Sequence, residues 1–245
     1  MKILENKTEI HAFLKEIKKK GKKVGLIPTM GSIHKGHLSL IKRCKQLNFF
    51  SLVTIFVNPT QFEDFKDFET YPIDHNNDKK SLENIGTDLL FYPKTKDLYP
   101  ESIKSQKTIY EYRDILCDIY RPGHFDGVTT VINSLFNLIR PDHVFFGEKD
   151  FQQLQIMKKL IEYNHSSIMM HSCPSVRMVN GMSYSSRYKK FSISQKKIFN
   201  EVANLLKRYI SELRKKFDIK IIEDLKNKLK EKGIEKIDYL EIRNE

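Results

Sequence analysis

Apolar residues in the first sixty positions alternate between helical and strand-like spacing. Over 7–20 they recur every three or four positions and stop at a glycine, which predicts an amphipathic helix. Continuous apolar runs over 24–27 and 52–57, each closely followed by a proline, predict two buried strands, and helical spacing over 40–47 separates them. A strand, a helix and a second strand in this order are typical of a parallel sheet.

The alternation of helices and strands continues to about residue 170. The most strongly periodic apolar face lies over 128–139, where it predicts a helix that ends before Pro141. The other predicted elements are weaker, and an irregular stretch over 93–123 separates them. Helices are predicted over 74–84 and 154–161, and short strands over 89–92, 144–146 and 167–170.

The character of the chain changes after the last predicted strand. A polar loop with Gly181 and several serines precedes a lysine-rich helical stretch over 194–216, and further charged helix follows it. We therefore expect an α/β fold, with a Rossmann-like, doubly wound parallel sheet over residues 1–174. A small C-terminal domain over residues 175–245 is expected to follow.

The composition is that of a folded protein in a reducing compartment. The 245 residues are 40% hydrophobic and 30% charged, with 10 glycines and 8 prolines, which excludes collagen-like and disordered classes. No apolar stretch approaches the about 18 to 20 residues of a membrane span, and Glu5 and Glu9 interrupt the region where a secretory signal needs an apolar core. Three cysteines without a CxxC pair predict reduced thiols. We expect a cytoplasmic protein that does not bind membranes.

The chain carries a strong positive charge. Its 43 basic and 31 acidic residues give a formal net charge of +12, which is compatible with nucleic acid, a membrane surface or an anionic substrate. Most of the excess is lysine, and alanine occurs only twice, a bias that favours an AT-rich genome over a polyanionic partner. We expect no nucleic-acid partner. A nucleic-acid-binding protein built on this fold is nevertheless an alternative, which rests on the basic stretch over 189–232.

A histidine-containing loop follows the first long strand. Residues 28–37 read Pro-Thr-Met-Gly-Ser-Ile-His-Lys-Gly-His, so that His34, Gly36 and His37 form an HxGH motif between a strand and a helix. Ligands of open α/β sheets bind beyond the carboxyl ends of the strands. There a glycine lets the backbone approach a phosphate, the helix N-terminus adds positive potential, and two imidazoles donate hydrogen bonds. We interpret the motif as a nucleotide-binding loop; a zinc pair, which lacks a third ligand, and two structural histidines are the alternatives.

Further polar clusters follow the predicted strands. The turn Gly147-Glu148-Lys149-Asp150 offers a lysine to phosphate oxygens, although a solvated turn has the same composition. Residues 183–187 offer hydroxyls and a guanidinium to a polyphosphate, or form a plain basic loop. Amides within 58–61 and 152–153 suit the hydroxyls and carbonyl of a small polar substrate. Arg121 lies in a glycine-framed loop, where it holds a carboxylate or caps structure.

Taken in order, these segments resemble the pantoate β-alanine ligase family, the pantothenate synthetases, within the HIGH-type nucleotidyltransferase superfamily. Several long segments in the family's order are far more specific than any single motif. They cover most of the chain to about residue 190: PTMGSIHKGHLSLI at 28–41, IFVNPTQF at 55–62, RPGHFDGVTTVINSLFNLIRPD at 121–142, FGEKDFQQLQ at 146–155 and SSR at 185–187.

The resemblance implies a two-step ligation with ATP as a substrate and Mg²⁺ beside it. The carboxylate of pantoate would attack the α-phosphate to give pantoyl adenylate and pyrophosphate, and β-alanine would then displace AMP to form pantothenate. It also implies a homodimer without a protein-bound metal. A nucleotidyltransferase with a phosphate or nucleotide acceptor is the alternative within the superfamily, and the pair of Gln61 and Gln153 argues against it.

The resemblance also implies roles for individual residues. His37 would be the proton donor, His34 would sit on the phosphates, and Lys149 would complete the catalytic set. Gln61 and Gln153 would bind pantoate, and Gln61 also β-alanine. The residues implied at the ATP site are Met30, Gly31, Ser32, Ile33, His34, Lys35, Gly36, His37, Gly147, Glu148, Lys149, Asp150, Val176, Tyr184, Ser185, Ser186 and Arg187.

The chain departs from the family pattern in a few places. Tyr184 and Tyr188 stand where the family usually has methionine and asparagine, and Ile73 stands where arginine is common. The sequence also stops where relatives usually continue with further strands, which implies a shortened C-terminal lid domain. Because such a lid closes over the nucleotide, we expect weaker ATP retention or slower closure rather than loss of activity.

Overall fold

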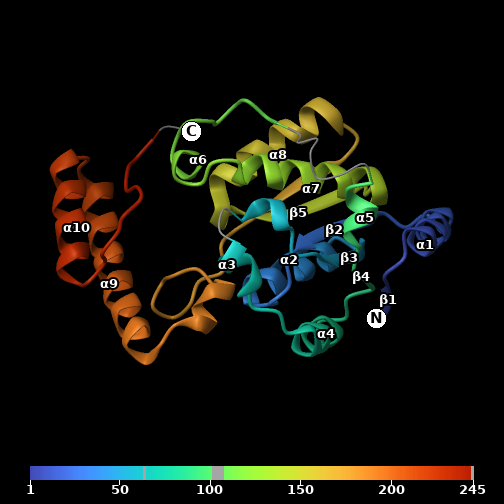
Figure 1. Ribbon diagram of the computed structural model, residues 1–245, viewed down its shortest axis with the longest axis horizontal. Coiled ribbons are helices and arrows are strands. Elements are labelled where there is room, and N and C mark those ends of the chain that lie inside the picture. The colour runs from blue at the N-terminus through green and yellow to red at the C-terminus, as the bar shows by residue number, and fades with distance from the viewer. Residues whose placement is uncertain (63–64, 101–107, 244–245) are drawn as a thin grey trace. The chain divides into compact units, whose positions relative to one another are not determined.

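The computed structural model describes residues 1–62, 65–100 and 108–243, and the chain divides into two compact units, Met1–Ser175 and Val176–Glu245. In the described part of the first unit, six strands form one parallel sheet in the order β1-β4-β3-β2-β5-β6 (Figure 1). The strands are β1 (Lys2–Leu4), β2 (Val24–Thr29), β3 (Phe50–Ile55), β4 (Leu89–Phe91), β5 (His143–Gly147) and β6 (Met169–Cys173).

Helices cover both faces of this sheet, as the doubly wound prediction requires (Figure 1). Alternate strand residues separate the two cores: Leu26 and Leu52 pack with α1, α7 and α8, whereas Ile27 and Val53 pack with α2 and α4. The bounds are α1 (Lys7–Lys19), α2 (Lys35–Gln46), α4 (His75–Asn84), α7 (His124–Ile139) and α8 (Phe151–Asn164).

Short elements connect the long ones. Three are single helical turns. The other two are 3₁₀ turns, of which one directly follows β5 and the other begins shortly after the end of β3. They are α3 (Phe65–Glu69), α5 (Thr95–Leu98), α6 (Cys117–Tyr120), η1 (Pro59–Gln61) and η2 (Glu148–Asp150).

The long elements of the first unit were predicted correctly to within a few residues, and the sheet edges were not. The strand β1 was missed because it is only three residues long and begins with a lysine. The last strand begins at Met169 rather than at residue 167 and continues to Cys173. Its polar residues His171 and Ser172 interrupt the apolar pattern, so the pattern does not predict the full strand. Among the described strands, β6 pairs with β5 alone.

The order of the strands creates a switch point in the middle of the sheet. From β2 the chain passes through α2 to β3 on one side, whereas β5 pairs with β2 on the other side. Connections therefore leave the carboxyl ends of β2 and β5 in opposite directions, which opens a crevice for a ligand there.

The second unit contains a 3₁₀ turn and two helices that pack on each other. They are η3 (Ser186–Lys190), α9 (Ile193–Lys215) and α10 (Ile219–Glu231) (Figure 1). Tyr209, Leu225 and Leu229 form the buried centre of this unit. The predicted helical stretch over 194–216 is confirmed as α9, and Asp218 starts a separate helix as the N-cap of α10.

Candidate active site

The loop between β2 and α2, residues 30–34, has an unusual backbone. Gly31 and Ser32 both have positive φ, +83° and +51°, in the left-handed region that a residue with a Cβ rarely adopts. The chain then extends through His34, which is the N-cap of α2. No side-chain hydrogen bond caps this helix, and no acidic residue lies in its first turn.

A buried carboxylate holds this loop in place through hydrogen bonds. Asp78, on α4, is fully buried and accepts hydrogen bonds from the backbone N–H groups of Ser32 at 2.7 Å and Ile33 at 2.6 Å. These two amides therefore point into the protein. Met30, His34, Gly36 and His37 keep part of their surface accessible, and Lys35 is exposed, whereas Gly31, Ser32 and Ile33 are buried.

The two histidines of the motif lie against each other. The rings of His34 and His37 are stacked, with centroids 4.0 Å apart and planes at 9°. Gly36 lies under this pair, because a Cβ at that position would come within 2.9 Å of His34 Cε1. The glycine is thus required by the position of the His34 ring as well as by any phosphate that approaches the backbone.

His37 is held in its neutral form. Burial, the neighbouring His34 and the positive charge of Lys149 together lower the pKa of His37 to about 3. Its Nδ1 atom is buried and has no hydrogen-bond partner among the described residues. Lys149, which follows β5, therefore acts electrostatically on the histidine that follows β2, and the two strand ends contribute to one site.

The turn after β5 is exposed and charged. Residues 148–150 form η2, and Lys149 Nζ lies 3.6 Å from Asp150 Oδ1. Both side chains are largely accessible, with 40% and 61% exposed. A pair this exposed contributes little to stability, so Lys149 is available for an anionic ligand.

The turn after β3 is fixed by hydrogen bonds to the start of α7. Asn58 Nδ2 donates to the carbonyl oxygen of Gly127, and Asn58 Oδ1 accepts from Tyr99 Oη at 2.7 Å. Gly127 packs directly on the backbone of Thr60, where a Cβ could not be accommodated. The loop before α7 adds two contacts, since Arg121 Nη2 donates to the carbonyl oxygen of Gln61 at 3.2 Å and His124 Nδ1 contacts the same oxygen at 2.9 Å.

The four predicted amides divide into two kinds. Asn58 and Gln152 hold the fold together: the amide of Gln152 bonds the backbone of residues 112, 115 and 117. Neither was expected in that role, because the sequence alone suggested substrate contacts. Among the described residues, no hydrogen bond involves the side-chain amide of Gln61 or Gln153, so both remain available to a ligand.

The predicted residues of the second unit lie in one loop and one turn of that unit. The N–H of Tyr184 donates to the carbonyl oxygen of Val176, and Ser185 Oγ accepts from the N–H of Arg187 as the N-cap of η3. Ser186 is buried and Arg187 is exposed. Tyr188, one of the departures, packs among Phe191 and Phe199.

Two residues near the site had no signal in the sequence. Asp78 lies in a polar helix, HNNDKKSLEN, where one more acidic residue is expected on the solvated side. His124 lies in the predicted glycine-framed loop but is placed by long-range contacts that periodicity does not reveal. Within the described residues, no group of three or more His, Cys, Asp or Glu could hold a metal ion.

A parallel α/β sheet whose switch point carries a stacked HxGH pair and a lysine defines a nucleotide-binding α/β protein. The family described as Pantoate-beta-alanine ligase matches residues 2–245 of this chain. The chain therefore belongs to the pantoate-beta-alanine ligase family.

Individual relatives agree with this assignment. The pantothenate synthetase of Caldicellulosiruptor saccharolyticus is 40% identical over 246 residues, which cover 96% of this chain and 85% of that protein. A crystal structure of pantoate-beta-alanine ligase from Francisella tularensis, complexed with beta-gamma ATP and beta-alanine, matches with a TM-score of 0.89 at 34% identity. That match covers 100% of this chain and 90% of the other. The pantothenate synthetase from Thermus thermophilus matches with a TM-score of 0.84 at 31% identity, over 94% and 83% of the two chains.

Membrane insertion through a helix has no support in this structure. Of the helices that the structure describes, none combines the length and apolar character of a membrane span.

Proposed function

We propose that this chain catalyses the ATP-dependent condensation of pantoate with β-alanine, which gives pantothenate, AMP and pyrophosphate through a pantoyl adenylate. One observation carries the proposal: His34 and His37 stack at the sheet's switch point, within the electrostatic influence of Lys149. The chain's membership of the pantoate-beta-alanine ligase family gives this site its substrates.

In the first step, a carboxylate oxygen of pantoate attacks the α-phosphorus of ATP, and the bond from that phosphorus to the pyrophosphate oxygen breaks. Negative charge grows on the α-phosphate and on the leaving pyrophosphate. Fixed donors stabilise this charge most where water is excluded, and the Nδ1 atom of His37 is buried. Lys149 supplies positive charge, and His34 donates a hydrogen bond to the phosphates.

ATP binding changes the protonation equilibrium of His37. Burial, the neighbouring His34 and the charge of Lys149 lower the pKa of His37 and keep its imidazole neutral. Phosphate oxygens bring negative charge close to the ring, and negative charge raises the pKa of a histidine. The bound nucleotide thus increases the fraction of His37 that carries a proton, and this form can donate it toward the oxygen that leaves the α-phosphate.

In the second step, the amine of β-alanine attacks the acyl carbon of the adenylate, and the acyl–oxygen bond to AMP breaks. Gln61 and Gln153 hold pantoate during both steps, with Gln61 also beside β-alanine. Amides without partners in the described residues suit the hydroxyls of pantoate, because a polar group rejects ligands that leave it unpaired. No covalent enzyme intermediate is required.

Magnesium enters as part of the nucleotide substrate. Mg²⁺ is usually held by substrate phosphates, waters and one or two carboxylates, rather than by a complete protein cage. The donor set near the site fits this pattern, because Glu148 and Asp150 present exposed carboxylates after β5. These two residues are the ones that would take a coordination position beside the phosphates.

The second unit contributes to nucleotide binding as a small lid domain, with Ser185 and Arg187 on the phosphates and Val176, Tyr184 and Ser186 completing the site. Residues 1–174 form the nucleotide- and pantoate-binding domain and 175–245 form the lid. The protein is proposed to act in the cytoplasm as a homodimer, without nucleic-acid or membrane partners.

A substrate-omission assay tests the proposal. Pyrophosphate release is expected to require both ATP and pantoate, and continued AMP release is expected to require β-alanine as well. Pyrophosphate formed at the same rate without pantoate would refute the substrate assignment. Dinucleotide or CDP-type products would instead identify a nucleotidyltransferase with another acceptor. Tight, strongly salt-dependent binding of nucleic acid would support a nucleic-acid-binding protein.

A further inference from the structure

We infer that Asp78 is a positioning residue for the nucleotide: its carboxylate sets the shape of the loop 30–34 and thereby the place of His34 and His37. The inference rests on the proposed function, because it gives that reaction an additional residue. Asp78 does not belong to the HxGH motif or to any other segment of the predicted site.

The carboxylate is committed to the loop through both of its oxygens. Oδ2 accepts from the N–H of Ser32 at 2.7 Å, and Oδ1 accepts from the N–H of Ile33 at 2.6 Å. Hydrogen bonds to an ionised acceptor are about twice as strong as neutral ones. Two short bonds to consecutive amides fix the orientation of both peptide groups.

The loop needs such a support because its backbone conformation is unfavourable. Ser32 has a Cβ and nevertheless adopts φ +51°, directly after Gly31 at φ +83°. The loop also packs tightly on the carboxylate, since a Cβ on Gly31 would lie 3.0 Å from Asp78 Oδ2 and 3.2 Å from Ile55 Cγ2. Loss of the two bonds removes a restraint on the positive φ of Ser32, and a change of that φ redirects the chain that leads into His34.

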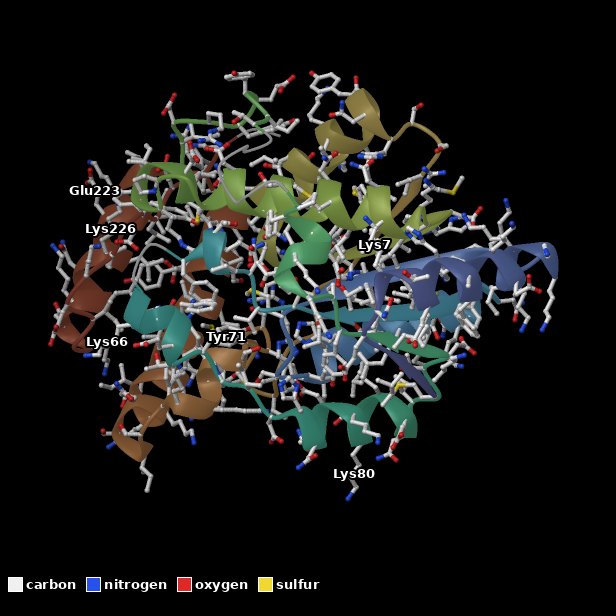
Figure 2. The ribbon with its side chains drawn as sticks, turned by 45° about the vertical axis from the view of Figure 1, so that its right-hand side comes forward. Lys7, Lys66, Tyr71, Lys80, Glu223 and Lys226 are labelled. Atoms are coloured by element: carbon white, nitrogen blue, oxygen red, sulfur yellow. The ribbon has the colours of Figure 1, made fainter. Side chains whose placement is uncertain are left out.

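Asp78 has no comparable task in its own helix. Asp74 already caps the start of α4, with Asn77 N–H as donor at 3.1 Å. Asp78 lies on the buried side of α4 together with Leu82, whereas Lys80 projects from the outer side (Figure 2). A carboxylate on the buried side loses its hydration, which is costly unless it is fully hydrogen-bonded. The loop amides provide those bonds.

The sheet contains a matched carboxylate with the same chemistry in another place. Asp88 Oδ2 accepts from Ser51 N–H at 2.8 Å and from Ser51 Oγ at 2.6 Å, at the amino end of β3. It therefore also bonds a backbone amide and a neighbouring donor, but at the sheet edge opposite the candidate site. A comparison of variants at Asp78 and Asp88 therefore separates an effect on the loop from a general effect on folding.

The test compares Asp78→Asn with Asp88→Asn. An asparagine keeps one acceptor and replaces the other with a donor, which opposes a backbone N–H. For Asp78→Asn, we expect kcat/KM for ATP to fall about 10- to 100-fold, because small misplacements of catalytic groups have effects of this size. We expect KM for pantoate to change less than about threefold, since Gln61 and Gln153 lie after other strands. Asp88→Asn should lower the unfolding free energy while leaving all kinetic constants within about twofold.

Binding of a non-hydrolysable ATP analogue, measured by calorimetry, keeps this test independent of the ligation. If the wild-type chain showed no pantoate-dependent release of pyrophosphate, the proposed function would fail, and analogue binding would still report on Asp78. The inference is overturned if Asp78→Asn binds the analogue as tightly as the wild type. It is also overturned if the variant raises KM equally for all three substrates. Should Asp78→Asn not fold, Asp78→Glu keeps a carboxyl group but moves it relative to the two amides, and is expected to give the same loss of analogue binding.

Discussion

Two pairs of histidines lie on the same sheet and serve different purposes. His34 and His37 stack at the carboxyl end of β2, with ring centroids 4.0 Å apart. His143 and His171 lie on β5 and β6, where His143 Nδ1 is 3.1 Å from His171 Nε2. Burial lowers the pKa of His37 in the first pair and of both His143 and His171 in the second. A close pair of imidazoles is therefore not sufficient to define a site.

The surroundings separate the two pairs. His143 stacks on Phe49 and His171 stacks on Phe145, so that aromatic rings occupy the faces a ligand would need. The hydrogen bond between the two rings also uses one nitrogen atom of each ring. At the other pair, Lys149 lies close enough to lower the pKa of His37, whose Nδ1 has no partner in the described chain. A cation, an unused nitrogen and the end of a parallel strand distinguish the candidate site.

The largest expected difference between the pairs is in catalysis. We expect His37→Ala to lower kcat about 10²- to 10³-fold, which is the usual effect of removing one preorganised donor. His143→Ala removes one hydrogen bond and one ring stack, so we expect about 1 kcal/mol less stability and kcat within about twofold of the wild type. Steady-state AMP release and urea unfolding measure the two effects. An unchanged kcat in His37→Ala would remove that residue from the mechanism.

The second expected difference is in the response of stability to acid. The pKa of His37 is about 3 in the folded chain and 6.5 as the ordinary value, so the unfolded chain binds a proton between these values that the native chain does not. The contribution of His37 to stability is complete above pH 6.5 and is lost progressively as the pH falls toward 3. Between about pH 8 and pH 5 the unfolding free energy of the wild type decreases, and we expect this decrease to be about 1–2 kcal/mol smaller in His37→Gln.

Urea unfolding of the wild type and of His37→Gln at several pH values measures this effect. His143→Gln is the matched control and is expected to change the acid dependence less, because Asp142 opposes the lowering of its pKa. Parallel curves for the wild type and His37→Gln over that pH range would contradict the neutral state of His37.

The smallest expected effect concerns Gly36, which packs against the ring of His34. Gly36→Ala places a Cβ 2.9 Å from His34 Cε1, and the ring has to move. We expect about a tenfold loss of kcat/KM for ATP and less than about 1 kcal/mol change in stability, since alanine favours a helix and the contacted group is a side chain. In a His34→Ala background the same substitution should have almost no further effect. An undiminished loss in that background would show that the glycine acts without His34.

The sequence was informative where structure depends on local pattern. The elements from α1 to β3, the helix α7 and the HxGH motif between strand and helix were all predicted from spacing and turn residues. It was uninformative where a polar residue is buried by distant parts of the chain. Asp78 contacts a loop 45 residues away, and His143 contacts a residue 28 positions away. Gln152 resembled Gln153 in the sequence, and only tertiary contacts separate their roles. Partner choice over such distances is decided by packing, which a periodic pattern does not encode.

The close approach of Gly127 to Thr60 has a consequence for local opening of the chain. Because the turn that carries Gln61 packs on the first turns of α7 without a side chain between them, we expect the turn and the helix to open together. Occupancy of the turn by a substrate then stabilises the amides of α7 as well. Slower hydrogen exchange in α7 is then expected when pantoate occupies its proposed site at Gln61.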